Sequence, residues 1–439
     1  MASTPETISP IHKNSFYGWY ALIGAALSAF VGGGLLMYSY GVFLPVMSEE
    51  FGWSRATIGL GMSIAVISFG LPSPLAGFLT GKFGAKTVLI LGNLVGGLGM
   101  ASMSLVNEVW QVYLIFITIG LGCCIGGVIP ATTVANNWFI KKRSLAIAII
   151  MALVGMGGFI FPLVTTALLT SVGWRLSWVV NGGIFIAIGV IIGSVCLVRN
   201  KPEDMGQLPD GMPAQPTREI HSSTTVGAGQ ETTGWTLKRI LRHPTIWLII
   251  VFGAAHGFVG GTITGHLVAY LRDLGSNPMV AASALSVIAG CGIIGSLVSG
   301  LLAMRVKVQH LILTCFILRL MALAILLTSQ NIFLIYLYTI LFGISTGMLM
   351  TAMFTIVGTY YGRANFARVQ GMVFAFTVVL QATGPTVAGA IHDSYNTYLP
   401  AFIILVVVTF IGLVCAFLAR PPKFTNISQG SMVVGTKGT

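Results

Sequence analysis

Three ionisable side chains interrupt long apolar stretches of the sequence, namely Arg319, His256 and His266. Leaving such a group unpaired inside a bilayer costs at least about 2.5–3.5 kcal/mol, so residues of this kind are functional candidates by default. Arg319 could hold an organic anion, or it could be a packing residue that bonds to backbone carbonyls of a neighbouring helix. His256 could exchange a proton near neutral pH, or it could be a neutral histidine that donates to a carbonyl. The residues by themselves leave both alternatives open.

A polar stripe surrounds His266. Thr262 and Tyr270 lie four residues before and after it, so in a helix all three share one face. Such a stripe near the outer end of a span could recruit an anion or control its entry, and His266 could also take part in proton coupling. The other candidate solute-binding residues are polar positions in three further apolar stretches: Tyr38, Ser296 and Gln381. Every Asp and Glu lies outside these stretches, which argues against a proton relay of carboxylates.

The sequence lacks the patterns expected of an enzyme. Its six cysteines lie in apolar stretches and are spaced for neither a disulfide framework nor a metal site. It has no nucleotide-binding loop, and its glycine-rich runs lie in apolar segments that cannot cradle a phosphate. We therefore expect no catalytic residues, no cofactor and no metal.

The composition identifies the elements that must position the candidate residues. The 439 residues include 23 Lys and Arg and 11 Asp and Glu, so 8% are charged, whereas a soluble domain carries about 25%. Apolar residues make up 55%. Long segments of alternating polarity, typical of membrane β-barrels, are absent. The predicted fold class is therefore an all-α membrane protein with many spans.

Twelve apolar runs are long enough to cross a bilayer, which takes roughly 20 residues. The predicted spans are 17–46, 55–80, 86–106, 109–136, 143–171, 175–198, 244–272, 278–303, 308–328, 331–360, 366–391 and 397–419. The long polar stretch 199–243 is rich in Pro, Gly, Ser and Thr, which favours a linker. Within it, residues 235–242 could form a short interfacial helix. The plan is a tail (1–16), a six-helix half (17–198), the linker (199–243), a second six-helix half (244–419) and a tail (420–439).

The positive charges predict the orientation. If the N-terminus is cytoplasmic, the inner loops and tails hold 19 of the 23 Lys and Arg, counted along the printed sequence. The outer loops then keep Arg55, Arg175 and Arg272 beside five acids. This asymmetry follows the positive-inside rule and predicts a cell (inner) membrane protein with both termini in the cytoplasm. It also accounts for the net charge of +12 without a nucleic-acid partner.

An internal repeat supports two related halves. Gly77 to Lys82 after the second span and Gly300 to Arg305 after the eighth are offset by 223 residues. Gly158 and Pro162 in the fifth span are matched by Gly384-Pro385 in the eleventh, at about the same offset. Two related six-helix halves place a solute site near the midplane between them, with alternating access by rocking of the halves.

Two motifs carry a family resemblance. The run from Gly77 to Lys86 resembles the loop motif of the major facilitator superfamily through Gly77, Lys82, Gly84 and Lys86. The run from Asn137 to Pro162 resembles the span-five signature of the monocarboxylate porters and their bacterial oxalate/formate relatives. The resemblance implies twelve transmembrane helices in two pseudo-symmetric halves, an organic-acid solute and a gating role for the loop motif.

The chain departs from that family at two places. Gly81 stands where the loop motif has an Asp that is thought to help lock the outward-open state. Ser296 stands where monocarboxylate-binding relatives place an Arg, and Gly292 where an accompanying acid is expected. The usual carboxylate clamp is therefore missing, and the substrate does not follow from the resemblance alone.

We therefore expect a secondary active transporter of a small organic anion, a monocarboxylate, that works by proton symport or exchange. Arg319 and one of His256 and His266 would supply the positive charge. The alternative within transport is an exporter or carrier of a larger or neutral metabolite or drug. A non-transporting membrane sensor is a further class, although the sequence contains no output domain for one. The expected partners are the solute, protons and the lipid bilayer, with the chain acting as a monomer.

Overall fold

A computed structural model describes residues 16–38, 40–53, 55–212, 237–275, 277–328 and 331–422. Every regular element in these residues is a helix. Residues 213–236 of the predicted linker and nearly all of both predicted tails lie outside the described residues. The helical part of the predicted interfacial segment is α9 (Leu237–Arg242).

The first half runs from α1 to η2. Its elements are α1 (Gly18–Tyr38), α2 (Tyr40–Phe51), α3 (Arg55–Gly70), α4 (Ser73–Phe83), α5 (Ala85–Ser102), η1 (Met103–Leu105), α6 (Val109–Ile125), α7 (Val128–Trp138), α8 (Arg143–Ile184) and η2 (Phe185–Leu197). Two short turns follow, η3 (Pro202–Met205) and η4 (Pro209–Gly211). After α9, the second half contains α10 (Pro244–Asp273), α11 (Pro278–Leu302), α12 (Val308–Thr328), α13 (Ile332–Tyr395) and α14 (Leu399–Leu418).

These helices make the twelve crossings that the sequence predicts. Nine described helical stretches are long and apolar enough to cross a membrane, and ten if the bent pair α3 and α4 is one span. Two of the stretches are too long for one crossing, since the 64 residues of α13 would measure about 96 Å if straight. The stretch of α8 and η2 breaks at Gly173 (φ 78°) and α13 breaks at Gly362 (φ 71°), in left-handed conformations that suit glycine. Each break separates two crossings.

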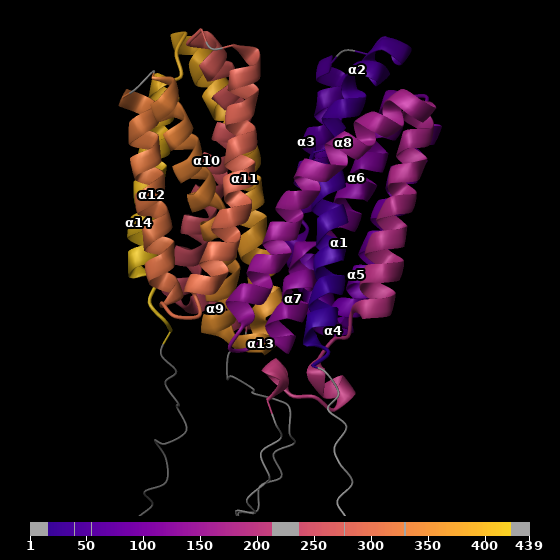
Figure 1. Cartoon of the computed structure of the whole chain (residues 1–439), viewed down its shortest axis with the longest axis vertical. Helices are drawn as coiled ribbons and strands as arrows, with labels where there is room; N and C mark the ends of the chain where they lie inside the picture. The colour runs from indigo at the N-terminus through magenta and orange to yellow at the C-terminus, as the bar shows by residue number, and fades with distance from the viewer. Residues whose placement is uncertain are drawn as a thin grey trace, which may run out of the picture.

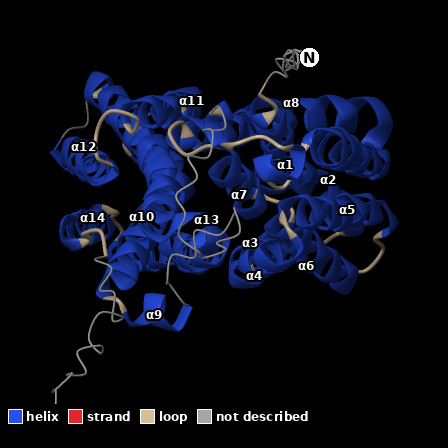
Figure 2. Cartoon of the chain, turned by 90° about the horizontal axis from the view of Figure 1, so that it is seen from below, coloured by secondary structure: helices blue, strands red, loops and turns tan. Residues whose placement is uncertain are grey.

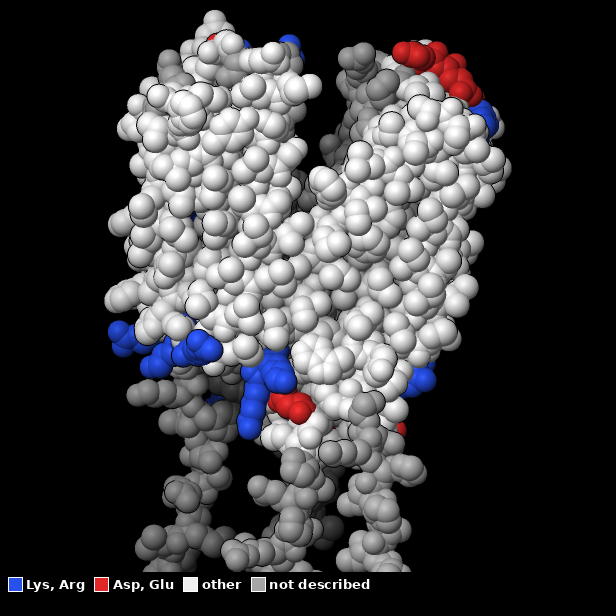
Figure 3. All heavy atoms as spheres, viewed as in Figure 1, with Lys and Arg blue, Asp and Glu red and all other residues white. Residues whose placement is uncertain are grey.

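The two halves form separate bundles, with α1 to α8 beside α10 to α14 (Figure 1). The view from below shows helices throughout both bundles (Figure 2). The bundles meet at one end and separate toward the other, which leaves a cleft between them (Figure 3). Lys and Arg gather at the closed end, while an acidic patch marks the open end (Figure 3). We call the closed end, where α4 and α7 lie, the basic end (Figure 1).

Glycines allow the halves to touch at the basic end. A Cβ added to Gly77 of α4 would lie 2.3 Å from the carbonyl oxygen of Ala367 in α13. One added to Gly300 of α11 would lie 3.0 Å from the carbonyl oxygen of Ser144 in α8 and 2.4 Å from Ala148 Cβ. Gly300 follows Gly77 by 223 residues and Ala367 follows Ser144 by 223, so the two contacts are pseudo-symmetric equivalents. The sequence offset thus recurs in the packing.

Candidate functional site

Close packing between α10 and α13 fixes the rotation of α10 and hence the direction of its polar side chains. A Cβ added to Gly257 would lie 2.1 Å from the Thr377 carbonyl oxygen, and one added to Gly261 would lie 2.0 Å from that of Gln381. A larger residue at either position would push the two backbones apart. His256 precedes Gly257 and reaches α12.

Arg319 and His256 are in direct contact. The Arg319 side chain is fully buried, and its Nη1 lies 2.9 Å from His256 Nδ1. Its Nη2 donates to Thr346 Oγ1 at 2.9 Å, and its guanidinium carbon lies 5.0 Å from the centre of the Phe342 ring. A guanidinium can only donate, so Nδ1 must be the acceptor in this bond. His256 is therefore neutral here, with its proton on Nε2.

The Arg319 pocket contains donors that lack acceptors. Arg319 Nε and the hydroxyl of the fully buried Tyr338 have no hydrogen-bond partner among the described residues. Tyr338 and Phe342 lie one turn apart on α13, with ring centres 5.6 Å apart, and Thr346 follows one turn later. No carboxylate forms an ion pair with Arg319 within the described part of the chain. A buried cation surrounded by donors that lack acceptors is suited to bind an anion.

Two residues of this pocket are not fully enclosed. His256 keeps 7% of its surface exposed and Thr346 is half-buried, whereas Arg319 and Tyr338 are fully enclosed. Sequence reasoning identified Arg319 and His256 but did not single out Tyr338 and Phe342. Their spacing of four residues, which puts both on the Thr346 face of one helix, was the available signal.

His266 lies in a different environment. Its Nε2 is 2.8 Å from the Pro385 carbonyl oxygen, which can only accept, so Nε2 carries a proton. Its Nδ1 is 3.1 Å from the Tyr398 hydroxyl, and the Tyr398 ring stacks on His392 at 4.3 Å. His392 in turn lies 3.6 Å from an Asp273 carboxylate oxygen. The structure thus separates His266 from the Arg319 pocket and occupies both of its ring nitrogens.

Of the other predicted polar residues, Thr262 and Ser296 bond to backbone carbonyl oxygens, and Gln381 has no described hydrogen bond. The Thr262 hydroxyl donates to the Phe258 carbonyl oxygen at 2.9 Å. Ser296 is buried and donates to the Gly347 carbonyl oxygen at 3.1 Å, so its hydroxyl is directed into the α11–α13 contact. Gln381 is exposed and has no hydrogen bond to any described residue. Tyr38 ends α1, and its side chain lies outside the described residues.

The loop-motif residues lie at the basic end. Gly77 is in the contact with α13 described above. Lys82 is exposed, with its Nζ 5.1 Å from the centre of the Phe83 ring. Gly84 has a positive φ of 82°, and Lys86 donates its backbone N–H to Asn200 Oδ1 at 2.8 Å.

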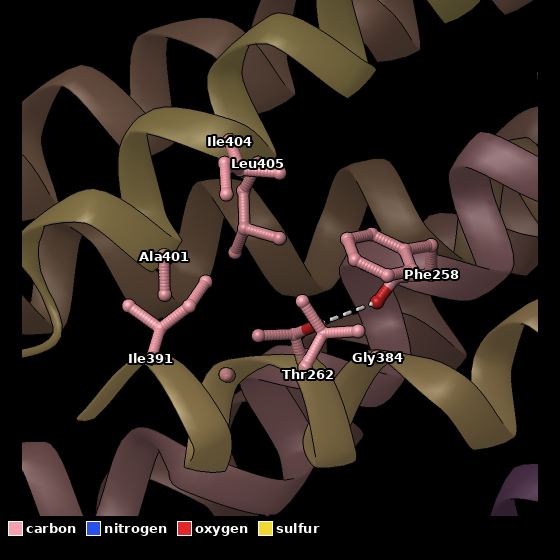
Figure 4. Close-up of a pocket in the computed structure, with 9 residues that line it drawn as sticks. Phe258, Thr262, Gly384, Ile391, Ala401, Ile404 and Leu405 are labelled. Atoms are coloured by element: carbon pink, nitrogen blue, oxygen red, sulfur yellow. Dashed lines mark hydrogen bonds between the residues drawn. The ribbon is translucent and has the colours of Figure 1, made fainter. Parts of the chain in front are cut away.

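Two cavities lie elsewhere in the structure, one with a charged lining and one with an apolar lining. At the basic end a cavity of about 400 Å³ lies between the halves, and its charged lining is Lys141, Arg143 and Lys307. Nearer the open end, an apolar pocket lies between α10, α13 and α14 (Figure 4). Its one side-chain hydroxyl, that of Thr262, is already bonded to Phe258 (Figure 4). This apolar pocket offers nothing to hold an anion. Across the described residues, no cluster of His, Cys, Asp or Glu could hold a metal ion.

Comparisons with known proteins agree with this architecture. The sequence model of the Major Facilitator Superfamily matches residues 19–329 and 258–432. The chain is 24% identical to Monocarboxylate transporter 6 of Homo sapiens over 384 residues, covering 85% of this chain and 75% of the relative. It is 25% identical to Monocarboxylate transporter 13 of Rattus norvegicus over 398 residues, covering 88% and 85%. Its fold is similar to the crystal structure of the fucose:proton symporter FucP of E. coli, with a TM-score of 0.69, 15% identity and coverage of 92% and 100%.

Proposed function

The chain belongs to the major facilitator superfamily, and from this we propose that it is a secondary active carrier of a small organic anion of the monocarboxylate class. At the coarser level it is a multi-pass membrane transporter of a small molecule, as the family and its apolar helices imply. The observation that carries the proposal is the buried Arg319 with His256 and Thr346 as its hydrogen-bond partners. The names of the two monocarboxylate transporters among its relatives support the same class.

A carboxylate fits the donors that surround Arg319. It has two oxygens for the guanidinium fork, and charge-assisted bonds of this kind are about twice as strong as neutral ones. Arg319 Nε and the Tyr338 hydroxyl would gain the acceptor they lack. The cations that line the basic-end cavity, Lys141, Arg143 and Lys307, favour passage of an anion on that side.

The Arg319–His256 bond gives a route to proton coupling. A carboxylate that takes Nη1 of Arg319 would release Nδ1 of His256, which could then accept a proton. The pocket would then hold one anion and two cations, so the charge of the proton would balance the charge of the anion. Symport of a monocarboxylate with a proton would use this coupling, and exchange of two anions would use the same pocket. His266 remains a second candidate for coupling.

The orientation is part of the proposal. The positive-inside rule places the basic end in the cytoplasm, which makes the cleft in Figure 3 open to the outside. Both termini are then cytoplasmic, because Tyr17 contacts Gln207 and Arg420 contacts Thr245 at the basic end. The half boundaries near 198 and 244 follow from the same arrangement, with the linker in the cytoplasm.

Uptake of labelled acids into proteoliposomes tests the proposal. The purified chain should take up at least one short monocarboxylate in a saturable way, faster when the outside is acidic. Arg319→Lys should reduce this uptake at least about tenfold, since a lysine cannot reproduce the two-nitrogen fork. Arg272→Lys, which changes an exposed arginine in the last turn of α10, is the matched control and should transport normally. Full transport by a folded Arg319→Ala variant would exclude the anion role of Arg319.

The alternative, a carrier of a larger or neutral solute or an exporter, is favoured by the state of Ser296. A serine supplies no positive charge where relatives have an Arg, and the Ser296 hydroxyl already donates to the Gly347 carbonyl oxygen. The fold neighbour FucP is named as a symporter of fucose, which is neutral. Saturable flux of a neutral solute, with none of any acid, would select this alternative.

A further inference from the structure

The basic end lacks one expected contact between the halves. A Cβ added to Gly81 of α4 would lie 3.4 Å from Nε of Arg368 in α13. The position where the loop motif has an acid therefore faces a cation of the other half but has no carboxylate to give it. An acid from a different part of the chain reaches the second half nearby.

That acid belongs to residues 199–212, which are bound to the first half. Asn200 Oδ1 accepts the backbone N–H of Lys86 at the start of α5, at 2.8 Å. Gln207 Oε1 accepts the backbone N–H of Tyr17 just before α1, at 3.0 Å. Hydrogen bonds at the starts of two different helices, α5 and α1, therefore hold the segment against the first half.

Asp210 provides the strongest anchor of the segment. Its carboxylate accepts the backbone N–H groups of Ile140 and Lys141 at 2.9 and 2.7 Å, and that of Lys142 at 3.3 Å. These amides directly precede α8, at the helix end that favours negative charge. A carboxylate with three backbone donors holds the segment at the turn between α7 and α8.

Glu203 connects the same segment to the second half. Its two carboxylate oxygens accept from Nη1 and Nη2 of Arg363 at 3.1 and 3.3 Å, a two-pronged ion pair. Arg363 directly follows the break at Gly362 and lies one turn before Ala367, which touches Gly77 of the first half. The ion pair therefore lies next to the place where the two halves meet.

We propose that residues 199–212 form a clasp that holds the basic end closed. Asp210 fixes the clasp to the first half, and the Glu203–Arg363 pair closes it onto the second. Glu203 and Arg363 are positioning residues of the transport cycle, since the halves can separate at the basic end only when this pair breaks. The clasp takes the place of the acid that is missing at Gly81. This inference concerns the gate and is independent of which solute is carried.

Hydrogen–deuterium exchange of the full chain in lipid nanodiscs tests the clasp without any substrate. The readout is exchange in two basic-end peptides, 73–83 and 363–375, against 399–418 as an internal reference. Glu203→Gln and Arg363→Gln should each speed exchange in the two basic-end peptides by about two- to fivefold, as expected for a partly exposed ion pair. The double variant Glu203→Arg with Arg363→Glu should restore slow exchange, because it re-forms the pair with the charges reversed.

Asp204→Asn is the matched control. Asp204 is adjacent to Glu203 but accepts the backbone N–H of Lys201 within the same turn, at 3.2 Å. Its substitution should leave the two basic-end peptides unchanged. Faster exchange confined to residues 199–212 in Glu203→Gln, or no recovery in the charge-reversed pair, would overturn the clasp.

Discussion

Arg319 and His256 share one hydrogen bond, 2.9 Å from Nη1 to Nδ1, in which the arginine is necessarily the donor. His256 Nδ1 cannot accept this bond while it carries a proton, because a protonated nitrogen has no lone pair to offer. Any anion that draws Nη1 away therefore makes Nδ1 basic at the same moment. In the proposed transport cycle this single bond links the arrival of the anion to the uptake of the proton.

Replacing His256 tests this link. Glutamine can still accept from Arg319 through its carbonyl oxygen but cannot take up a proton, so His256→Gln should fold and bind the anion. We expect uptake by this variant to lose its acceleration by an outside-acid pH gradient, measured in proteoliposomes with and without the gradient. His310→Gln, at an exposed position at the start of α12, is the control and should keep the gradient dependence. A His256→Gln carrier that still responds fully to the gradient would move coupling to another residue.

His266 should behave differently. Both of its nitrogens already have partners, Pro385 and Tyr398, so its loss should affect stability more than coupling. We expect His266→Ala to lower the free energy of unfolding by about 1–3 kcal/mol, because it leaves the partly buried Pro385 carbonyl and Tyr398 hydroxyl without this partner. Thermal unfolding in detergent measures this, and Gln381→Ala, whose side chain has no described hydrogen bond, is the control. Loss of gradient dependence in a variant of normal stability would instead assign coupling to His266.

The sequence was sufficient for the twelve crossings but not for the contacts of the site. Long apolar runs separated by polar breaks predict crossings directly, and the breaks at Gly173 and Gly362 fall between predicted spans. The contact of Arg319 with His256 joins residues 63 positions apart. It depends on the rotation of three packed helices, which hydropathy does not determine.

The sequence also does not predict that residues 199–212 bind to the first half. This stretch lacks hydrophobic periodicity, and its composition is that of a linker. Its structure comes from single side chains that bind the ends of other helices, as Asp210 does at Lys141. Such contacts leave no periodic pattern, so the sequence does not distinguish Glu203 and Asp210 from other charges of the linker.

The close contact at Gly77 predicts a strong effect of a single methyl group. In Gly77→Ala the new Cβ would lie 2.3 Å from the Ala367 carbonyl oxygen, so the halves must separate at the basic end. With an overpacking cost of about 1–3 kcal/mol, exchange in peptides 73–83 and 363–375 should rise between about fivefold and about a hundredfold. Gly290→Ala is the control, since a Cβ there would meet nothing within 4 Å. Unchanged exchange in Gly77→Ala would mean that the contact does not hold the gate.

Restoring an acid at Gly81 tests whether the clasp compensates for its absence. In Gly81→Asp the Cβ would lie at ordinary contact distance, 3.4 Å from Arg368 Nε, which places the carboxylate within reach of that guanidinium. Arg368 is exposed, so the new pair should contribute at most about 1 kcal/mol, or about a fivefold slowing of exchange at the basic end. Added to Glu203→Gln, the same change should return exchange toward that of the unmodified chain, and high salt should weaken the recovery. Gly81→Asn has the same shape without the charge and should give no recovery, and neither should Gly81→Asp combined with Arg368→Gln. Equal recovery by Asp and Asn would show that size, and not a carboxylate facing Arg368, controls the gate at this position.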